Sequence, residues 1–442
     1  MRELLLILIV LVLSIVALPK PLWGMYGYIW FGLMRPDVLA WSVGKYPYSY
    51  VLAVTTLLGS LLHVGRLRVF VTNPLCLWLV LFQVPLAVSA VFAQVPELCI
   101  EPFWYFERVI LMALLIPVLV GAESQFRRLF MIMAFSLGLL GLKFGFFGLL
   151  HGGVRFTQGY GGMWAGNNEL ALGLSMATPL CWYVRRVLVA RWARWLSLAM
   201  TVGCIAAVVM TYSRGGALAL IAALVLIVMR EKRRLLTFTV IVVLGAPAVY
   251  LIHDTYFLRL ETLRHPTEEG SANSRLEYGK AAIAMWEDYP ILGVGFGQTN
   301  YVRLSTRYVG RKVDQVVHNS YLQTLVDSGI GAFVIYLGLL FGTIRWLQVS
   351  ATRAQTEYPA MVVYLVAIQT AIVAFAVGST FGSIEHYDFY YMLLMCAASC
   401  YEILRERSLE VADFEHEPDS VTAAQGGTAP EQIGRASCRE RV

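Results

Sequence analysis

The chain has 442 residues, of which 58% are hydrophobic and only 14% are charged. One soluble core of this length would not bury so much apolar surface, so the composition excludes an ordinary soluble enzyme and indicates a protein with many membrane spans. The net charge of +6 does not indicate nucleic-acid binding, because the basic residues lie in short loops between apolar segments and set the membrane topology.

Apolar segments close to the roughly 20 residues that cross a bilayer recur along the chain. The first two, residues 4–18 and 22–34, are short and are separated by Lys20 and Pro21, so they predict either a hairpin of two spans or one broken span. No small-residue cleavage site follows the first, so we expect it to be retained rather than removed as a signal peptide. The later segments are residues 46–62, 73–93, 109–121, 129–150, 169–184, 195–212, 215–229, 235–252, 329–344, 359–378 and 387–404. The pattern predicts an all-α polytopic membrane protein with about 12 transmembrane helices.

Lysine and arginine concentrate in every second connection between these segments. By the positive-inside rule such loops are cytoplasmic, and the alternate loops face outward. The largest outward loop covers residues 253–328. The basic connections, predicted to be cytoplasmic, are residues 66–68, 127–128, 185–194, 230–234 and 345–353.

We predict one transmembrane domain over residues 1–404, in which the outward loop 253–328 holds two helices. Residues 405–442 are polar and rich in Glu, Gly, Ala and Pro, which predicts a disordered cytoplasmic tail. The end of this tail, "GRASCRERV", looks like a vector-derived scar. The seven cysteines lie mostly inside apolar segments and lack paired metal spacing, which favours a packing role.

The stretch "TYSRGG" places Arg214 at an outward junction between two apolar segments. A charged residue at membrane depth costs at least a few kcal/mol, so it is a candidate for function. The alternative is an arginine whose head group merely reaches the interface. Gly215 and Gly216 favour the functional interpretation, since they would let a ligand approach the backbone closely.

A second outward stretch, "HGGVRFTQGYGGMWAGNNEL", is glycine-rich and holds Arg155 and Asn167 just before an apolar segment. Backbone N–H groups and the helix dipole converge at such positions and suit anions. A flexible connector explains the same composition equally well. No Walker lysine pattern is present, so a nucleotide P-loop has no support.

The largest outward loop begins with an amphipathic helix. Ser274 and Glu277 make a capping box, and the pattern stops before Pro290. This helix carries Arg275 in its first turn; the alternative is a surface helix on which Arg275 is only a solvated charge. The glycines of "PILGVGFG" follow and predict a tight turn rather than a dinucleotide site, because no strand and helix frame them.

The stretch "HNSYLQTLVDSG" predicts a second helix from His318 to Gly329, with His318 and Asn319 in its first turn. The positive end of a helix disfavours a charged imidazole, so His318 would stay neutral and could act as a general base. A histidine that only satisfies the helix start is the commoner alternative for a residue of this kind standing alone.

The predicted topology collects Arg155, Arg214, Arg275 and His318 at one membrane boundary. One base and several fixed cations beside lipid suit a reaction in which a hydroxyl attacks a carbon whose leaving group is a lipid-held diphosphate. The arginines would hold the diphosphate by charge-assisted hydrogen bonds, and the histidine would remove the proton of the hydroxyl. The outward carboxylates are scattered without an Asp-x-Asp pair, so catalysis without a metal or other cofactor is the simpler interpretation.

These stretches resemble the O-antigen ligase and polymerase superfamily of bacterial inner-membrane glycosyltransferases. The resemblance rests on Arg155 followed by "GNNELAL", on "SRGG", on "RLEYGKAAIAMWEDYPILGVGFG" and on "HNSYLQTLVDSG", which occur in the order of the family. The opening 36 residues are also similar to O-glycosylation ligases of this superfamily. The resemblance covers most of the chain up to about Leu404.

The resemblance implies a helical fold of about 12 spans related to the C-type glycosyltransferases, with a large periplasmic loop over the active site. It implies transfer of a glycan from undecaprenyl diphosphate to an acceptor, with inversion and without a metal. His318 matches the essential histidine of the family, Arg214 and Arg155 match arginines that bind the diphosphate, and Arg275 matches the arginine that opens the periplasmic helix. Asp327 stands where the family often has glutamate.

The acceptor separates the remaining possibilities. We favour an O-antigen ligase that uses the lipid A-core as acceptor, with His318 as base and Arg214, Arg155, Arg275, Asn319 and Asn167 as candidate substrate-binding residues. An O-antigen polymerase or a protein O-glycosylation ligase would share the same motifs. A lipid-linked glycan flippase is the alternative from another class, but no internal repeat of the kind common in transporters is visible, and the cations lie at one face.

Overall fold

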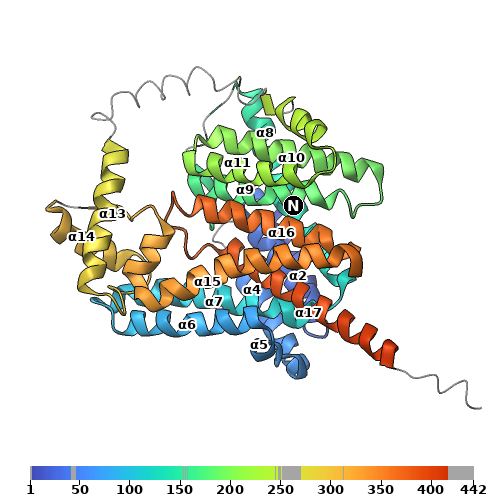
Figure 1. The fold of residues 1–442 in the computed structure, drawn as a ribbon, viewed down its shortest axis with the longest axis horizontal. Helices are drawn as coiled ribbons and strands as arrows, with labels where there is room; N and C mark the ends of the chain where they lie inside the picture. The colour runs from blue at the N-terminus through green and yellow to red at the C-terminus, as the bar shows by residue number, and fades with distance from the viewer. Residues whose placement is uncertain are drawn as a thin grey trace, which may run out of the picture.

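The computed structural model describes residues 2–40, 46–152, 154, 156, 158–243, 245–246, 250, 270–311 and 313–416. The described residues form a bundle of helices that run largely side by side, with α13 and α14 at one end and the last turns of α17 at the other (Figure 1). The helices are α1 (Arg2–Ala17), α2 (Pro21–Met34), α3 (Pro36–Leu39), α4 (Tyr48–Ser60), the 3-10 helix Leu61–Arg66, α5 (Val69–Thr72), α6 (Pro74–Val91), α7 (Glu97–Leu119), α8 (Glu123–Leu150), α9 (Asn167–Val184), α10 (Arg191–Thr211), α11 (Arg214–Arg230), the helix Arg234–Val243, α13 (Gly270–Asp288), α14 (Thr299–Val309), α15 (Ser320–Glu357), α16 (Pro359–Gly378) and α17 (Asp388–His416).

Six of these helices are long and apolar enough to cross a membrane, namely α6, α7, α8, α10, α15 and α16. Helices α1, α2 and α11 have 16, 14 and 17 residues. At about 1.5 Å per residue they are shorter than a bilayer core of roughly 30 Å. The structure confirms a mostly helical protein with several candidate spans, whereas the total of about 12 crossings stays a prediction.

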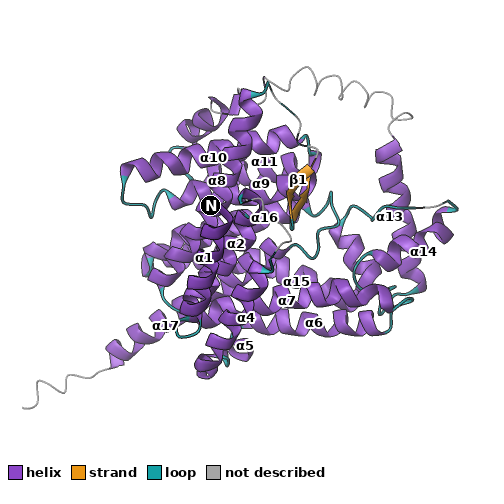
Figure 2. Cartoon of the chain, turned by 180° about the vertical axis from the view of Figure 1, so that it is seen from behind, coloured by secondary structure: helices purple, strands orange, loops and turns teal. Residues whose placement is uncertain are grey.

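One short hairpin departs from the all-α expectation. Strands β1 (Gln158–Gly161) and β2 (Trp164–Gly166) pair antiparallel within the glycine-rich stretch before α9. The hairpin is anchored by Trp164, which is fully buried and donates its indole N–H to the Leu33 carbonyl at 3.2 Å. Figure 2 shows the hairpin at the end of the bundle that faces α13 and α14. The stretch is therefore a fixed structure over these strands rather than a simple connector.

Small residues let α8 and α10 pack backbone against backbone. A Cβ atom added at Gly145 would lie 2.4 Å from the carbonyl oxygen of Gly203, and one added at Gly203 would lie 2.5 Å from the Cα of Leu142. Neither position has room for a side chain, which is typical of closely packed membrane helices.

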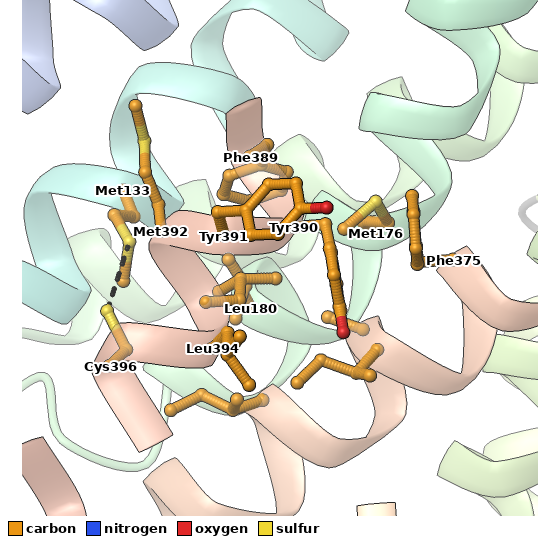
Figure 3. Packing of buried hydrophobic residues seen from close by; sticks show 14 of the residues in the cluster. Met133, Met176, Leu180, Phe375, Phe389, Tyr390, Tyr391, Met392, Leu394 and Cys396 are labelled. Carbon is orange, nitrogen blue, oxygen red and sulfur yellow. Dashed lines mark hydrogen bonds between the residues drawn. The ribbon is translucent and has the colours of Figure 1, made fainter. Parts of the chain in front are cut away.

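Helix α17 carries an aromatic cluster into the centre of the bundle. Tyr390 stacks on Phe375 of α16, with ring centroids 4.3 Å apart and 5° between the ring planes, and Figure 3 shows this pair beside the other buried side chains. The Cys396 sulfur lies 4.0 Å from that of Met133 in α8. All six described cysteines are buried and unbridged, which confirms a packing role for them.

Helices α13 and α14 and the first part of α15 share a small core of their own. Ala282 and Met285 of α13 pack with Tyr301 of α14 and with Val326 of α15. The expectation of two helices in this region is incomplete, because α14 is a third; the helical spacing of Tyr301 and Leu304 was its sequence signal. Helix α13 begins at Gly270, about one turn before the predicted capping box, and ends at Asp288 before Pro290 as predicted.

Helix α15 bends at Gly329, where the sequence predicted a helix end. Gly329 has φ 75° and ψ −177°, values that favour glycine, and the chain then resumes a helix that continues to Glu357. A Cβ atom at this position would lie 2.0 Å from the carbonyl oxygen of Ile291. The turn before α14 therefore fits into the bend of α15.

Candidate active site

The starts of α9 and α11 are joined by side chains from two of the sequence motifs. The Asn167 side-chain amide donates to the Thr211 carbonyl at 3.2 Å, and the Ser213 hydroxyl donates to Asn168 Oδ1 at 2.7 Å. Ser213 Oγ also accepts the Gly216 N–H at 3.1 Å, which caps α11. The predicted candidate Asn167 thus lies beside the motif that contains Arg214.

Arg214 is the first residue of α11, and its side chain is exposed. The two glycines after it are covered on both sides. A Cβ atom at Gly216 would lie 2.4 Å from that of Ala171 in α9, and one at Gly215 would lie 2.8 Å from the Cβ of Phe381. Their small size therefore allows close packing beside Arg214, and the ligand approach expected from sequence stays a prediction.

His318 precedes α15 instead of lying in its first turn, which corrects the predicted helix start. Asn319 is the N-cap: its Oδ1 accepts the Leu322 N–H at 3.0 Å. His318 itself has φ 59°, in the left-handed region that is uncommon for residues other than glycine. Such a conformation costs on the order of 1 kcal/mol and persists only where neighbours hold it.

The neighbour that holds His318 is a loop between α16 and α17, residues 379–387. The His318 N–H donates to the Ser383 hydroxyl oxygen at 3.0 Å. The Ser320 N–H donates to the Ser379 carbonyl at 2.8 Å, and the Ser320 hydroxyl donates to the Gly382 carbonyl at 2.7 Å. The 379–387 loop also supplies Phe381 over the start of α11, so it joins the His318 segment to the Arg214 segment.

Behind Ser383 a buried chain of polar groups runs into the protein. The Ser383 hydroxyl donates to Gln323 Oε1 at 2.9 Å, and the Gln323 amide donates to Asp327 Oδ1 at 2.9 Å. The Gln298 N–H donates to Asp327 Oδ2 at 3.0 Å, and its side-chain amide donates to Glu385 Oε1 at 2.5 Å. Sequence reasoning missed Gln298, Gln323, Ser383 and Glu385, because no local motif links segments so far apart in the chain.

Electrostatic interactions bring three of the predicted residues together. Arg275 of α13 interacts electrostatically with both Arg214 and His318. Burial, and then the Arg214 charge, lower the pKa of the Arg275 guanidinium below its usual value. Burial, and then the Arg275 charge, lower the pKa of the His318 imidazole below 6.5. At neutral pH His318 is therefore uncharged and able to accept a proton.

The polar chain contains a carboxyl group with an unusual titration. Burial raises the pKa of Glu385 to about 7, with its hydrogen bond from Gln298 acting in the opposite direction. Glu385 Oε2 is buried, and no described residue forms a hydrogen bond with it. Burial lowers the pKa of the adjacent His386 to about 3. The 3.7 Å approach between His386 Nδ1 and Glu385 Oε1 is therefore not an ion pair at neutral pH.

Two sequence candidates remain, Asn319 and Arg155, and the structure describes only the first. Asn319 lies next to His318, where its side chain caps α15 and its amide donates to the Thr380 carbonyl at 3.4 Å. Arg155 lies outside the described residues, so the structure gives it no position. Within the described residues, no group of three or more His, Cys, Asp or Glu side chains is placed to hold a metal ion.

Two family models match separate parts of the chain. Residues 199–337 match the model described as O-Antigen ligase, which spans Arg214, Arg275 and His318. Over residues 199–337, hereafter the O-antigen ligase domain, the chain is therefore similar to the O-antigen ligase family. Residues 1–177 match a family of unknown function, DUF5935, and no curated protein matches the chain.

The O-antigen ligase domain contains only part of the arrangement around His318. It includes α11, α13, α14 and the first part of α15, but the 379–387 loop lies beyond its last matched residue. Asn167 lies in the segment that matches DUF5935. The domain implies a glycosyltransferase-type ligase or polymerase that uses a lipid-linked glycan and an acceptor, and it supports the predicted resemblance.

Proposed function

We propose that this protein is an O-antigen ligase that transfers a glycan from undecaprenyl diphosphate to a hydroxyl of the lipid A-core. The proposal places the His318 end of the bundle on the periplasmic face of the bacterial inner membrane and needs no metal. Its main support is that Arg275 interacts electrostatically with both Arg214 and His318 inside the O-antigen ligase domain.

The proposed reaction uses a base and two cations for separate tasks. His318, uncharged at neutral pH, accepts the proton of the acceptor hydroxyl as the hydroxyl oxygen bonds to the anomeric carbon of the donor sugar. The bond between that carbon and the diphosphate oxygen breaks on the opposite face, which inverts the anomeric centre. The diphosphate leaves with the bonding electron pair, and the proton passes from His318 to water.

Arg214 and Arg275 stabilise the charge that develops on the departing diphosphate. A guanidinium offers several N–H donors in a fixed plane and stays charged, so it matches phosphate oxygens well. Two cations beside each other are unfavourable in the empty site, and a bound diphosphate removes that repulsion. Donor binding would then order α13 against the start of α11. The roles of Arg155, Asn167 and Asn319 in holding the substrates are part of the same proposal.

A transfer assay with purified components tests the proposed base. Full-length protein would be supplied with an undecaprenyl diphosphate-linked glycan and lipid A-core, and glycosylated lipid A-core would be measured by gel. His318→Ala should lower the rate roughly 10²-fold to 10⁴-fold, which is the usual contribution of a general base. Arg307→Gln, an exposed charge on α14, should retain the wild-type rate. A His318→Ala protein that transfers glycan at full rate would overturn the assignment.

The acceptor needs a separate experiment in cells. In a strain that lacks the protein, a ligase predicts that lipid A-core carries no polymeric bands while lipid-linked polymer accumulates. Survival of a single-repeat band on lipid A-core would instead indicate a polymerase. A normal lipopolysaccharide ladder with unglycosylated protein acceptors would indicate a protein O-glycosylation ligase. The shared motifs make these the main alternatives; a flippase would show no transfer with purified components.

A further inference from the structure

A large basic cavity lies at the end of the bundle opposite His318. Helix α11 starts with Arg214 beside the candidate site and ends at Arg230, which at about 1.5 Å per residue is roughly 25 Å away along its axis. Around Arg230 the ends of α9, α10, α11, α15 and α16 and the helix Arg234–Val243 line an open cavity of about 1540 Å³. The positive-inside rule predicts that this end of the bundle faces the cytoplasm.

The charge of this basic cavity is strongly one-sided. Seven of its lining residues are lysine or arginine, and one, Glu231, is acidic. Glu231 Oε1 already accepts hydrogen bonds from Arg185 at 2.9 Å, Arg186 at 2.7 Å and the Trp182 indole at 2.7 Å. The other cations of the lining are Arg191, Arg194, Arg230, Lys232 and Arg233. An excess of fixed positive charge therefore remains for an anion.

One cation of the cavity is incompletely satisfied. Arg230 donates through Nη2 to Gln348 at 2.7 Å and to Gln369. Its Nη1 group is buried and has no hydrogen-bond partner among the residues that the structure describes. A buried N–H without an acceptor costs about 1–3 kcal/mol, so a group that supplies acceptor oxygens here would recover a missing interaction. Phosphate oxygens fit this requirement, because guanidinium groups bind them with good geometry.

The remaining wall of the cavity is apolar and lies at the expected membrane boundary. Leu198 of α10, Leu236 and Val240 of the helix Arg234–Val243, and Val362 and Val366 of α16 form this wall. Two tryptophans of α10 mark the same level of the bundle, since Trp192 and Trp195 are each 71% exposed. Exposed tryptophans are typical of the interface between lipid head groups and acyl chains. A ligand with a charged head and apolar chains would match both parts of the cavity.

We propose that the basic cavity binds the phosphate of an anionic phospholipid, whose acyl chains lie along the apolar wall. Basic pockets between membrane helices commonly hold such head groups. This lipid site is separate from the proposed transfer reaction, because its residues lie at the opposite end of α11 from Arg214. A soluble phosphate would meet the same cations but would leave the apolar wall without a partner.

A lipid titration of the purified full-length protein tests the proposal. In neutral detergent, the thermal unfolding midpoint would be followed with dioleoyl phosphatidylglycerol, with dioleoyl phosphatidylcholine, and with glycerol phosphate at equal phosphate concentration. Only phosphatidylglycerol should raise the midpoint. The double variant Arg191→Gln/Arg233→Gln, which leaves the ion pairs of Glu231 intact, should need roughly 10-fold to 30-fold more lipid, since each such charge contributes a factor of about five. Arg345→Gln, an exposed charge of α15 outside the cavity, should titrate as wild type.

Each other outcome would overturn a stated part of the proposal. Equal stabilisation by phosphatidylcholine would show that the head-group charge is irrelevant. Equal stabilisation by glycerol phosphate would show that the site takes a soluble phosphate. Loss of lipid response in Arg345→Gln as well would place the effect in general surface charge. If the double variant does not fold, Arg233→Gln alone gives the same comparison, with an expected weakening of about five-fold.

Discussion

The two ends of the bundle are both rich in arginine, but the arginines meet different partners. At the end that contains Arg230, Glu231 accepts hydrogen bonds from Arg185, Arg186 and Trp182. At the end that contains His318, Arg275 interacts with the like charge of Arg214 and lowers the pKa of the histidine. At the first end a carboxylate holds two of the arginines, whereas at the second end positive charge gathers around a base.

The two buried carboxyl groups behind Ser383 differ from Glu231, because their hydrogen-bond donors are neutral amides. Asp327 and Glu385 belong to the polar chain behind Ser383, where they accept hydrogen bonds from the amides of Gln298 and Gln323. Neutral donors hold these carboxyl groups without drawing on the positive charge of the arginines. The arginines of such a site stay available for an anion. They repel each other when no anion is bound. Four measurements would break or sharpen this comparison.

The largest effect is expected from removing positive charge at the His318 end. Arg214→Gln should lower kcat/KM for the lipid-linked donor about 10²-fold to 10³-fold, because a preorganised group facing the leaving diphosphate is lost. The readout is the transfer rate over a range of donor concentrations. Arg345→Gln, which removes an exposed charge near the other end, is the matched control. Equal losses in both variants would remove the distinction between the two ends.

The next effect concerns the buried carboxyl group of the His318 end. The pKa of Glu385 is about 7 when folded and about 4.5 when unfolded, so its contribution to stability is present below pH 4.5 and is lost as pH rises through 7. Glu385→Gln keeps an acceptor for Gln298 and removes the titration. Above pH 7 it should be more stable than wild type by up to about 3 kcal/mol, and the difference should shrink toward pH 4.5.

Thermal unfolding midpoints from pH 4.5 to 8 would measure this difference. Asp327, Tyr336, Tyr391 and His386 are titratable groups that interact with Glu385 or lie beside it, and the substitution leaves all four in place. Glu287→Gln, at an exposed position of α13, should follow the wild-type curve at every pH. A difference between Glu385→Gln and wild type that does not change with pH would contradict the raised pKa.

At the opposite end, removing the carboxylate of the basic cavity should have the reverse effect on stability. Glu231→Gln leaves Arg185 and Arg186 without their acceptor charge, and both pairs are partly exposed. We expect a loss of about 1–2 kcal/mol in the free energy of unfolding at neutral pH. Glu357→Gln, at an exposed position on the last turn of α15, should change stability by less than about 0.5 kcal/mol. Stabilisation by Glu231→Gln would mean that its arginines are not held by this carboxylate.

The smallest effect is a shift in the pH dependence of transfer. His318 must be uncharged to act as a base, so activity should fall on the acid side with a midpoint below pH 6.5. Arg275→Gln removes a nearby positive charge, which should raise the pKa of His318 and move this midpoint to higher pH by a fraction of a pH unit. The same profile for Arg307→Gln should match that of wild type. A midpoint that stays in place or moves to lower pH would show that Arg275 does not act on the histidine.

Local patterns predicted part of this site well. The glycines of "PILGVGFG" predicted a turn, and Gly293, Gly295 and Gly297 all have positive φ values in the structure. Helix α13 ends before Pro290 as predicted, because proline cannot continue the hydrogen-bonding pattern. The start of α15 was misplaced by two residues, since the capping side chain belongs to Asn319 and not to His318. The confirmed turn, the confirmed helix end and the misplaced helix start all depend on contacts within a few residues.

The 379–387 loop could not have been predicted as part of the site. Nothing in its sequence indicates that Ser383 would accept the N–H of His318, or that Phe381 would cover Gly215. These contacts join segments more than 60 residues apart. They arise because α16 and α17 return the chain to the start of α15, and that return depends on the packing of the whole bundle.

The sequence by itself determined that the protein is helical and apolar and that Arg214, Arg275 and His318 share one end of it. Composition, helix periodicity and the alternation of basic loops are local or additive properties, so they can be read along the chain. Only the tertiary structure decided that Arg275 lies within electrostatic reach of both partners, that Glu385 is buried, and that seven cations line one cavity at the other end. Those features depend on burial and on distances between remote segments, which set the strength of every charge interaction.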